Sequence, residues 1–258
     1  PNSVNEFINK GSSFLDSLSG YDKGVAIEDI YKYLVKYKAE SWRDCARWAS
    51  DMYLELYRDQ IVQLLHNFPV DSTNSNGELF WSKGKRCPKV IDYDLTNKLV
   101  LDFVEATTHL FSQTYGFTEE FTRDDIIAEL VSYQPYEFKV DVDKKIASND
   151  SELSEETMKD TKYVLPDDIE KKNLYPLTFE KDDNSNWHIA FITAASNLRS
   201  SNYGIPESTF DEVKGIAGKI IPAVATTTSI VSGLITVELL KYCAFYENSS
   251  SYKNEKII

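Results

Sequence analysis

The chain has 258 residues, of which 42% are hydrophobic and 27% charged, so it is long and apolar enough for a substantial core and is not disordered by composition. Its formal net charge is −13, and because a field of that sign repels phosphate backbones we expect no nucleic-acid partner. The three cysteines lie far apart, with no CxxC pair and no histidine at ligand spacing, which fits a reducing compartment and indicates neither a disulfide framework nor a zinc site.

The first third of the chain is predicted to be helical. Apolar residues from Val25 to Val35 fall near one helix face, and Ser41 is expected to cap a long helix that reaches Leu65 before Pro69 stops it. Further elements are expected as a loop at 71–89, helices at 99–114, 123–132, 187–202 and 227–242, a short strand at 138–142, and a polar loop leading into a short helix at 147–163. Because period-two alternation is scarce, the chain is predicted to be mainly α.

One uncharged run raises the question of a membrane span. Residues 220–237 contain no charge over 18 positions, which is at the edge of spanning length. Only ten of the 18 are apolar, six are Ser or Thr, and Pro222 and Gly233 interrupt the run. We therefore predict a helix buried in a soluble protein and no membrane partner.

Two segments of the chain resemble each other. "LDFVEATTHLFSQTYGF" (101–117) and "IAFITAASNLRSSNYGI" (189–205) align without gaps at an offset of 88 residues, with six identities in 17 positions. This similarity predicts two equivalent helices, each with an apolar face and each ended by a glycine, Gly116 and Gly204. A solenoid would need at least three such copies.

The segment "FEKDDNSNWHIAF" carries three acids and a histidine in close succession: Glu180, Asp182, Asp183 and His188. One hypothesis is a metal or acid/base site, although three carboxylates in a row on an irregular segment often point apart. The other is structural, since Asp92 and Asp94 stand at the matching positions before the first of the two similar segments. On this second hypothesis the acids cap free N–H groups at the positive end of a helix dipole. We favour the capping role.

Local chemistry singles out one cysteine as a candidate nucleophile. Cys87 has Lys85, Arg86 and Lys89 beside it, and neighbouring cations lower a thiol pKa. Cys45 and Cys243 fall on apolar helices and are expected to be inert core thiols. No GxGxxG, Walker, GxSxG or HExxH motif occurs. The residues alone therefore indicate an acidic, mainly helical domain without a complete active site.

Several long motifs resemble the eukaryotic ubiquitin-activating enzyme family. They are "LLHNFPVDSTNSNGELFWSKGKRCPK", the two similar segments with "FEKDD" before the second, and "IAGKIIPAVATTTSIVSGLITVELLK". In order, they match the second catalytic-cysteine half-domain and the return of the chain into the adenylation domain. The resemblance implies a helical half-domain at 1–205, lacking the nucleophile segment, and a partial α/β adenylation domain at 206–258.

The resemblance also implies a function for the parent protein. The family adenylates the C-terminus of ubiquitin with ATP and magnesium, carries it on a cysteine as a thioester, and passes it to a ubiquitin-conjugating enzyme. Ubiquitin and conjugating enzymes are the implied partners, in the cytoplasm and nucleus. The family's nucleophile lies in a Pro-x-Cys-Thr segment upstream of this half-domain, and none of the three cysteines occupies that place. We therefore expect no catalytic, cofactor-binding or metal-binding residue in this chain, and an inactive fragment.

One pair of site residues is carried over from the family. In "KKIASNDSEL" the resemblance places Asn149 and Asp150 where the family has residues that assist thioester chemistry, and a carboxylate there would help to deprotonate a thiol or amine. A surface Asx turn remains the structural alternative. Two alternatives also stay open for the whole chain: a non-enzymatic helical interaction module, and an activating enzyme for another ubiquitin-like modifier.

Overall fold

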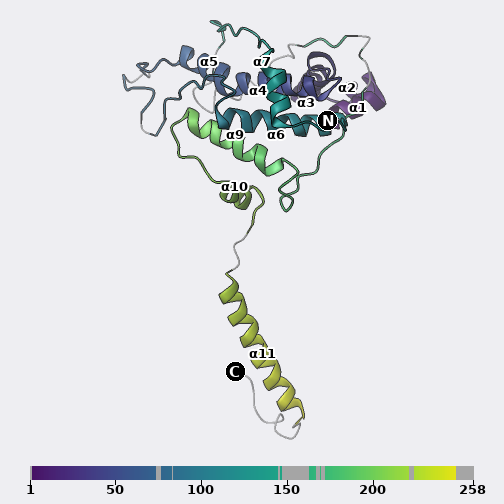
Figure 1. Cartoon of the computed structure of the whole chain (residues 1–258), viewed down its shortest axis with the longest axis vertical. Helices are drawn as coiled ribbons and strands as arrows, with labels where there is room; N and C mark the ends of the chain where they lie inside the picture. The colour runs from purple at the N-terminus through teal and green to yellow at the C-terminus, as the bar shows by residue number, and fades with distance from the viewer. Residues whose placement is uncertain are drawn as a thin grey trace. The chain divides into compact units, whose positions relative to one another are not determined.

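A computed structural model describes residues 2–73, 77–82, 84–144, 146, 163–166, 169, 172–220 and 224–247. The chain divides into two units, Pro1–Gly218 and Lys219–Ile258. The first unit is a layered packing of helices (Figure 1), and the second is described by one helix. The predicted domain boundary at residue 205 concerns the parent enzyme and stays a prediction.

The N-terminal part of the first unit forms a small helical layer of its own. It consists of α1 (Asn2–Lys10), α2 (Ser12–Asp16), α3 (Gly20–Tyr31) and a π-helical continuation, η1 (Lys32–Lys36). Val4, Ile30 and Leu34 from this layer are buried in one cluster with Trp48 and Tyr115 from the elements that follow. The layer is thereby joined to the rest of the unit through apolar contact, and the expected helix around Val25 to Val35 is confirmed.

The long helix expected after Ser41 is confirmed. It runs as α4 (Trp42–Tyr53), a π-helical segment η2 (Leu54–Asp59) and α5 (Gln60–Asn67). Its start is a capping box, in which the backbone N–H of Ser41 donates to the Asp44 carboxylate at 3.1 Å.

Two further helices build the core against α4. They are α6 (Lys98–Tyr115) and α9 (His188–Asn202), and Figure 1 shows α6 between α4 and α9. The shared core includes Tyr53 on α4, Phe103 and Val104 on α6, and Ala194 and Leu198 on α9, all buried. This core therefore lies where α4 and α9 pack their apolar side chains against α6.

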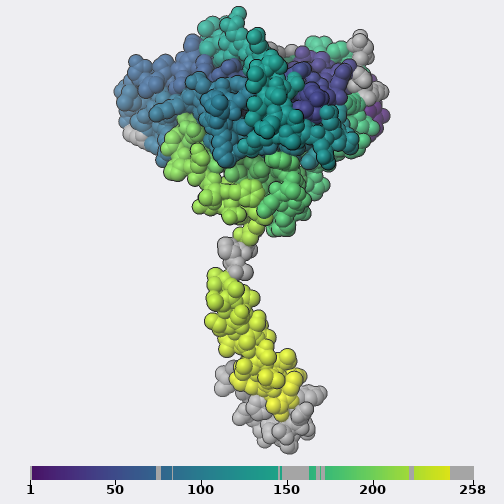
Figure 2. Space-filling model, viewed as in Figure 1, coloured from purple at the N-terminus to yellow at the C-terminus, as the bar shows by residue number. Residues whose placement is uncertain are grey.

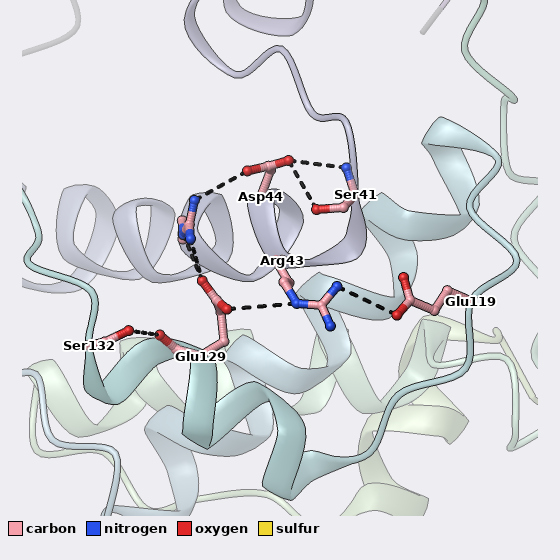
Figure 3. A network of polar contacts seen from close by, with 7 residues as sticks. Ser41, Arg43, Asp44, Glu119, Glu129 and Ser132 are labelled. Carbon is pink, nitrogen blue, oxygen red and sulfur yellow. Dashed lines mark hydrogen bonds and ion pairs between the residues drawn. The ribbon is translucent and has the colours of Figure 1, made fainter.

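A shorter helix, α7 (Arg123–Val131), is held on α4 by an ion-pair network (Figure 3). Arg47 on α4 donates from Nε to the Glu129 carboxylate at 2.8 Å, and Arg43 approaches the same carboxylate at 3.9 Å. The Glu129 side chain is only 15% exposed, so its two arginine contacts are partly shielded from water. Charge therefore adds to the apolar contact between the two helices.

The last helix of the first unit, α10 (Phe210–Ala217), covers part of α9. It starts with a capping box in which the Thr209 hydroxyl accepts from the backbone N–H of Glu212 at 3.3 Å. Lys214 on this helix donates to the Asn184 side chain at 2.8 Å, and α10 lies beside the segment that precedes α9 at the surface (Figure 2).

The two similar segments do form equivalent helices. Each ends with a left-handed glycine, Gly116 at φ 75° and Gly204 at φ 60°. The next N–H closes the turn in the same way in both copies, Phe117 onto the Ser112 carbonyl at 2.9 Å and Ile205 onto the Ser200 carbonyl at 2.8 Å.

One expectation about the fold is wrong. Residues 138–142 form no strand, because the backbone of Asp141 bonds the side chain of Gln63 on α5 and not another strand. The only β-pairing in the described residues is one isolated bridge between Thr73 and Leu79. The polar loop and short helix expected at 147–163 lie outside the described residues, except for Tyr163.

The second unit is described by α11 (Ala225–Glu247), which is longer than the predicted helix. Its apolar side chains are exposed and not buried, with Ile230, Leu234 and Leu240 each more than 60% accessible. The expected α/β character of this part is not confirmed, since the described residues form this helix alone. No helix in the described part of the chain has both the length and the apolar character that a membrane span needs.

Candidate functional site

The acidic segment before α9 forms a turn that organises the start of the helix. The Asp183 carboxylate accepts from the backbone N–H of Ser185 at 2.8 Å and from its hydroxyl at 2.6 Å. The Asn186 side-chain oxygen then accepts from the backbone N–H of His188, the first residue of the helix, at 2.9 Å. The first helical N–H is therefore bonded by Asn186, the residue before the N-cap Trp187. The pKa of Asp183 is held below its usual value by its bonds to Ser185.

The same turn precedes α6. Asp94 accepts from the backbone N–H of Thr96 at 2.8 Å, and Asn97 accepts from the N–H of Leu99 at 2.9 Å. Asp94 thus has its structural counterpart in Asp183, at an offset of 89 residues, and not in Asp182 as the ungapped alignment pairs them. The shared element is Asp-x-Ser/Thr-Asn, which the alignment at 88 missed by one position.

The other three residues predicted for this segment shape the same loop. The backbone N–H of Glu180 donates to Nδ1 of His188 at 3.0 Å, and the N–H of Asp182 donates to the Glu180 carboxylate at 2.7 Å. Across the described residues, no cluster of three His, Cys, Asp or Glu side chains is placed to hold a metal ion. The carboxylates of Glu180 and Asp183 accept hydrogen bonds from backbone N–H groups of the loop. The first N–H of α9 donates instead to the side chain of Asn186.

An aromatic stack next to this loop was not predicted from the sequence. The His109 ring stacks on the Trp187 ring, with 4.1 Å between the ring centres, and on the Phe121 ring, with 4.3 Å between the ring centres. Phe121 in turn stacks on Trp42, with 4.6 Å between the ring centres. Burial lowers the pKa of His109, although Glu105 opposes the shift. Trp187 has a φ of 68°, which is rare for a residue with a side chain. The stack joins α4, α6 and the loop before α9.

A cavity of about 520 Å³ lies beside the starts of α6 and α9. Three of its charged side chains are paired with one another, because Arg123 bonds Glu105 through Nε at 2.9 Å and Asp102 through Nη2 at 2.8 Å. Glu105 is buried, and the two carboxylates raise the pKa of Arg123. These groups are engaged with one another, so they do not form a free acid/base pair.

The three cysteines lie in different surroundings. Cys45 is buried as expected, and burial raises its thiol pKa to about 12. Cys243 is exposed on α11, so the prediction of a core thiol there is wrong: the side chains of this helix that the structure describes are exposed.

Cys87 is half-buried, and two of its basic neighbours are occupied elsewhere. Arg86 donates to the carbonyl of Gly204 at 3.2 Å, and the Lys85 ammonium lies 4.4 Å from the centre of the Phe80 ring. Because both cations make these other contacts, the structure does not support them as activating groups for the Cys87 thiol. The proposed thioester-assisting residues, Asn149 and Asp150, lie outside the described residues, and their role stays a prediction.

Comparison with known proteins gives a family match over most of the chain. Residues 1–214 match the family described as the ubiquitin-activating enzyme SCCH domain. The chain is 42% identical over 246 residues to ubiquitin-like modifier-activating enzyme 1 of Homo sapiens, covering 92% of this chain and 23% of the relative. It is 40% identical to the enzyme of the same name from Mus musculus, over 97% of this chain and 25% of the relative.

A fungal relative gives a similar result. Ubiquitin-activating enzyme E1 1 of Schizosaccharomyces pombe is 39% identical over 240 residues, which cover 88% of this chain and 24% of the relative. The chain thus spans about a quarter of the length of the relatives that it matches.

Proposed function

The chain belongs to the ubiquitin-activating enzyme family, and from this premise we propose that it serves as the helical half-domain beside the catalytic cysteine of an ATP-dependent enzyme that activates ubiquitin. The match of residues 1–214 to this half-domain is the observation that carries the proposal. The parent enzyme joins the ubiquitin C-terminus to AMP and then transfers it to a cysteine as a thioester. Adenylation provides a good leaving group, which a thiolate displaces from the activated carbonyl.

In this proposal the chain supplies a scaffold and no nucleophile. The burial of Cys45 and the engaged cations next to Cys87 support a carrier cysteine outside these 258 residues. ATP and magnesium bind to other parts of the parent, ubiquitin and its conjugating enzymes are the partners, and the enzyme works in the cytoplasm and nucleus.

Ubiquitin is a better candidate than another modifier. The matching family is described as ubiquitin-activating enzyme, and the Schizosaccharomyces pombe relative, 39% identical, is named ubiquitin-activating enzyme E1 1. These two descriptions support ubiquitin as the modifier.

The proposal is tested by incubating the 258-residue chain and, separately, the full-length enzyme with ubiquitin, ATP and magnesium. Intact mass is then measured with and without a thiol reductant. We expect a reductant-sensitive ubiquitin adduct on the full-length enzyme and none on the chain. The absence of both this adduct and ATP–pyrophosphate exchange in the full-length protein would favour a non-enzymatic module.

A further inference from the structure

A second cavity, of about 380 Å³, lies between α5 and the C-terminal end of α9. Ile61 and Leu64 of α5 form an apolar wall, Arg199 comes from α9, and Lys144 adds a second cation. No described residue in its lining carries a carboxylate, whereas the cavity beside the starts of α6 and α9 has three. Its volume is in the range of sites that hold a small molecule or a few side chains of a peptide.

Arg199 is held in position by two contacts with η2. Its Nη2 donates to the Leu56 carbonyl at 3.1 Å, and its guanidinium lies 5.1 Å from the centre of the Tyr57 ring. The Tyr57 hydroxyl in turn donates to the Ala195 carbonyl on α9 at 3.1 Å. A guanidinium has five N–H donors, and the bond to Leu56 uses one of them, so an oriented cation still has donors to offer a ligand.

The two cations of the cavity are not neutralised by the described part of the chain. The ion pairs among these residues include neither Arg199 nor Lys144. Of the acids nearest in sequence, Asp59 is buried in an ion pair with the preceding arginine, and the Asp141 carboxylate accepts from the backbone N–H of Asp143 at 3.0 Å. Asp143 is exposed and lies outside the cavity lining. The cavity is therefore complementary in charge to an anion.

A basic loop is fixed to the same end of α9. The backbone N–H of Lys89 donates to the Asn202 carbonyl at 2.6 Å, and Arg86 donates to the Gly204 carbonyl at 3.2 Å. Residues 80–91 contain four cations and no acid, and Lys85, Arg86 and Lys89 are exposed. In a chain whose net charge is −13, this end of α9 thus has a positive surface that attracts acidic groups.

We propose that the cavity between α5 and α9 is a docking site for an acidic, partly apolar peptide segment of a partner protein. One carboxylate of the peptide binds between Arg199 and Lys144, because the planar guanidinium fork matches a carboxylate. A neighbouring aliphatic side chain packs on Ile61 and Leu64, and the basic loop attracts further carboxylates. The apolar wall favours a peptide over a nucleic acid, whose backbone offers no aliphatic side chain. This binding is separate from thioester chemistry.

The test measures the binding of a fluorescein-labelled peptide, Glu-Leu-Glu-Glu-Leu-Glu, to the 258-residue chain by fluorescence anisotropy at low salt. The same peptide with glutamine in place of glutamate is the ligand control. Arg199→Gln and Lys144→Gln each remove one cation of the cavity, and Lys10→Gln removes the same charge from α1 as the matched control. Tm is measured for each variant. Lys144 is exposed, so Lys144→Gln keeps the test valid if Arg199→Gln does not fold.

We expect the acidic peptide to bind with a Kd on the order of 100 μM, and the glutamine peptide to bind at least about 10-fold more weakly. Arg199→Gln should raise the Kd of the acidic peptide about 10-fold and Lys144→Gln about 3-fold, with Lys10→Gln unchanged. The docking site is disproved if the acidic peptide does not bind, if the glutamine peptide binds as tightly, or if Lys10→Gln weakens binding as much as the cavity variants. Equal binding of oligothymidine, with the same loss in Arg199→Gln, would also disprove it in favour of a general polyanion surface.

Discussion

Asp94 and Asp183 illustrate how far single residues could be predicted. The sequence placed acids before two similar helices and assigned them a capping role in place of a metal site. The bonds place Asn97 and Asn186 on the helix amides and the two aspartates on the turns just before them. The one-residue shift was not predictable from the alignment, because it accompanies the left-handed backbone of Trp187.

These aspartates should make stability depend on pH. Hydrogen bonds to Ser185 and Thr96 hold the pKa of Asp183 and Asp94 below the usual value, so the bonded carboxylates stabilise the fold above the unfolded pKa of about 4. That stability is lost as pH falls through the lower folded values. We expect Asp183→Asn to reduce the loss of stability between about pH 4 and pH 2, as measured by urea unfolding.

Asp182→Asn is the matched control for this measurement, since its carboxylate neighbours Asp183 but lies outside the turn's hydrogen bonds. Asp183→Asn should lose less stability than this control between about pH 4 and pH 2. If both variants lose the same stability as the pH falls, the hydrogen bonds of the Asp183 carboxylate do not contribute to the pH dependence of stability.

At the scale of elements, the internal similarity predicted α6 and α9 and the glycines that end them. It could not predict the different surroundings of these glycines. A Cβ on Gly116 would lie 2.5 Å from the Tyr175 ring, whereas a Cβ on Gly204 would meet nothing within 4 Å. Tyr175 reaches this place because its N–H donates to the Thr114 carbonyl at 2.7 Å, a long-range contact that leaves no local pattern in the sequence.

The two glycines therefore make a matched pair of substitutions. Gly204→Ala should destabilise the protein by about 1 kcal/mol, since alanine is strained in a left-handed conformation. Gly116→Ala should cost about 1 kcal/mol more, because the Tyr175 ring must also move. Urea unfolding of both variants measures the difference in the free energy of unfolding. An equal decrease in the two variants would contradict a cost from the contact with Tyr175.

At the scale of the whole molecule, the mainly α architecture was predictable because most helices carry strong apolar periodicity or a clear cap. The strand at 138–142 was predicted wrongly, since the polar partner of Asp141 is Gln63, 78 positions away. The surface that covers α11 in a larger protein could not be predicted either. Its sequence is apolar on all sides, which is typical of a helix buried in a larger protein, and the pattern does not say which surface buries it.

The exposed apolar side chains of α11 should promote self-association. We expect the 258-residue chain to form oligomers at micromolar concentration and residues 1–218 alone to stay monomeric, as measured by light scattering after size exclusion. Leu234→Lys in the full chain should shift it toward the monomer. Identical masses for the full chain and for residues 1–218 would contradict this expectation.

The central claim is that these residues support a thioester without carrying it. The most direct measurement is a peptide map of the full-length enzyme charged with ubiquitin, digested without reductant, to locate the cysteine that holds the labile bond. The account predicts a cysteine outside residues 1–258, with Cys45, Cys87 and Cys243 unmodified. A labile ubiquitin adduct on Cys87, or on either of the other two, would contradict it.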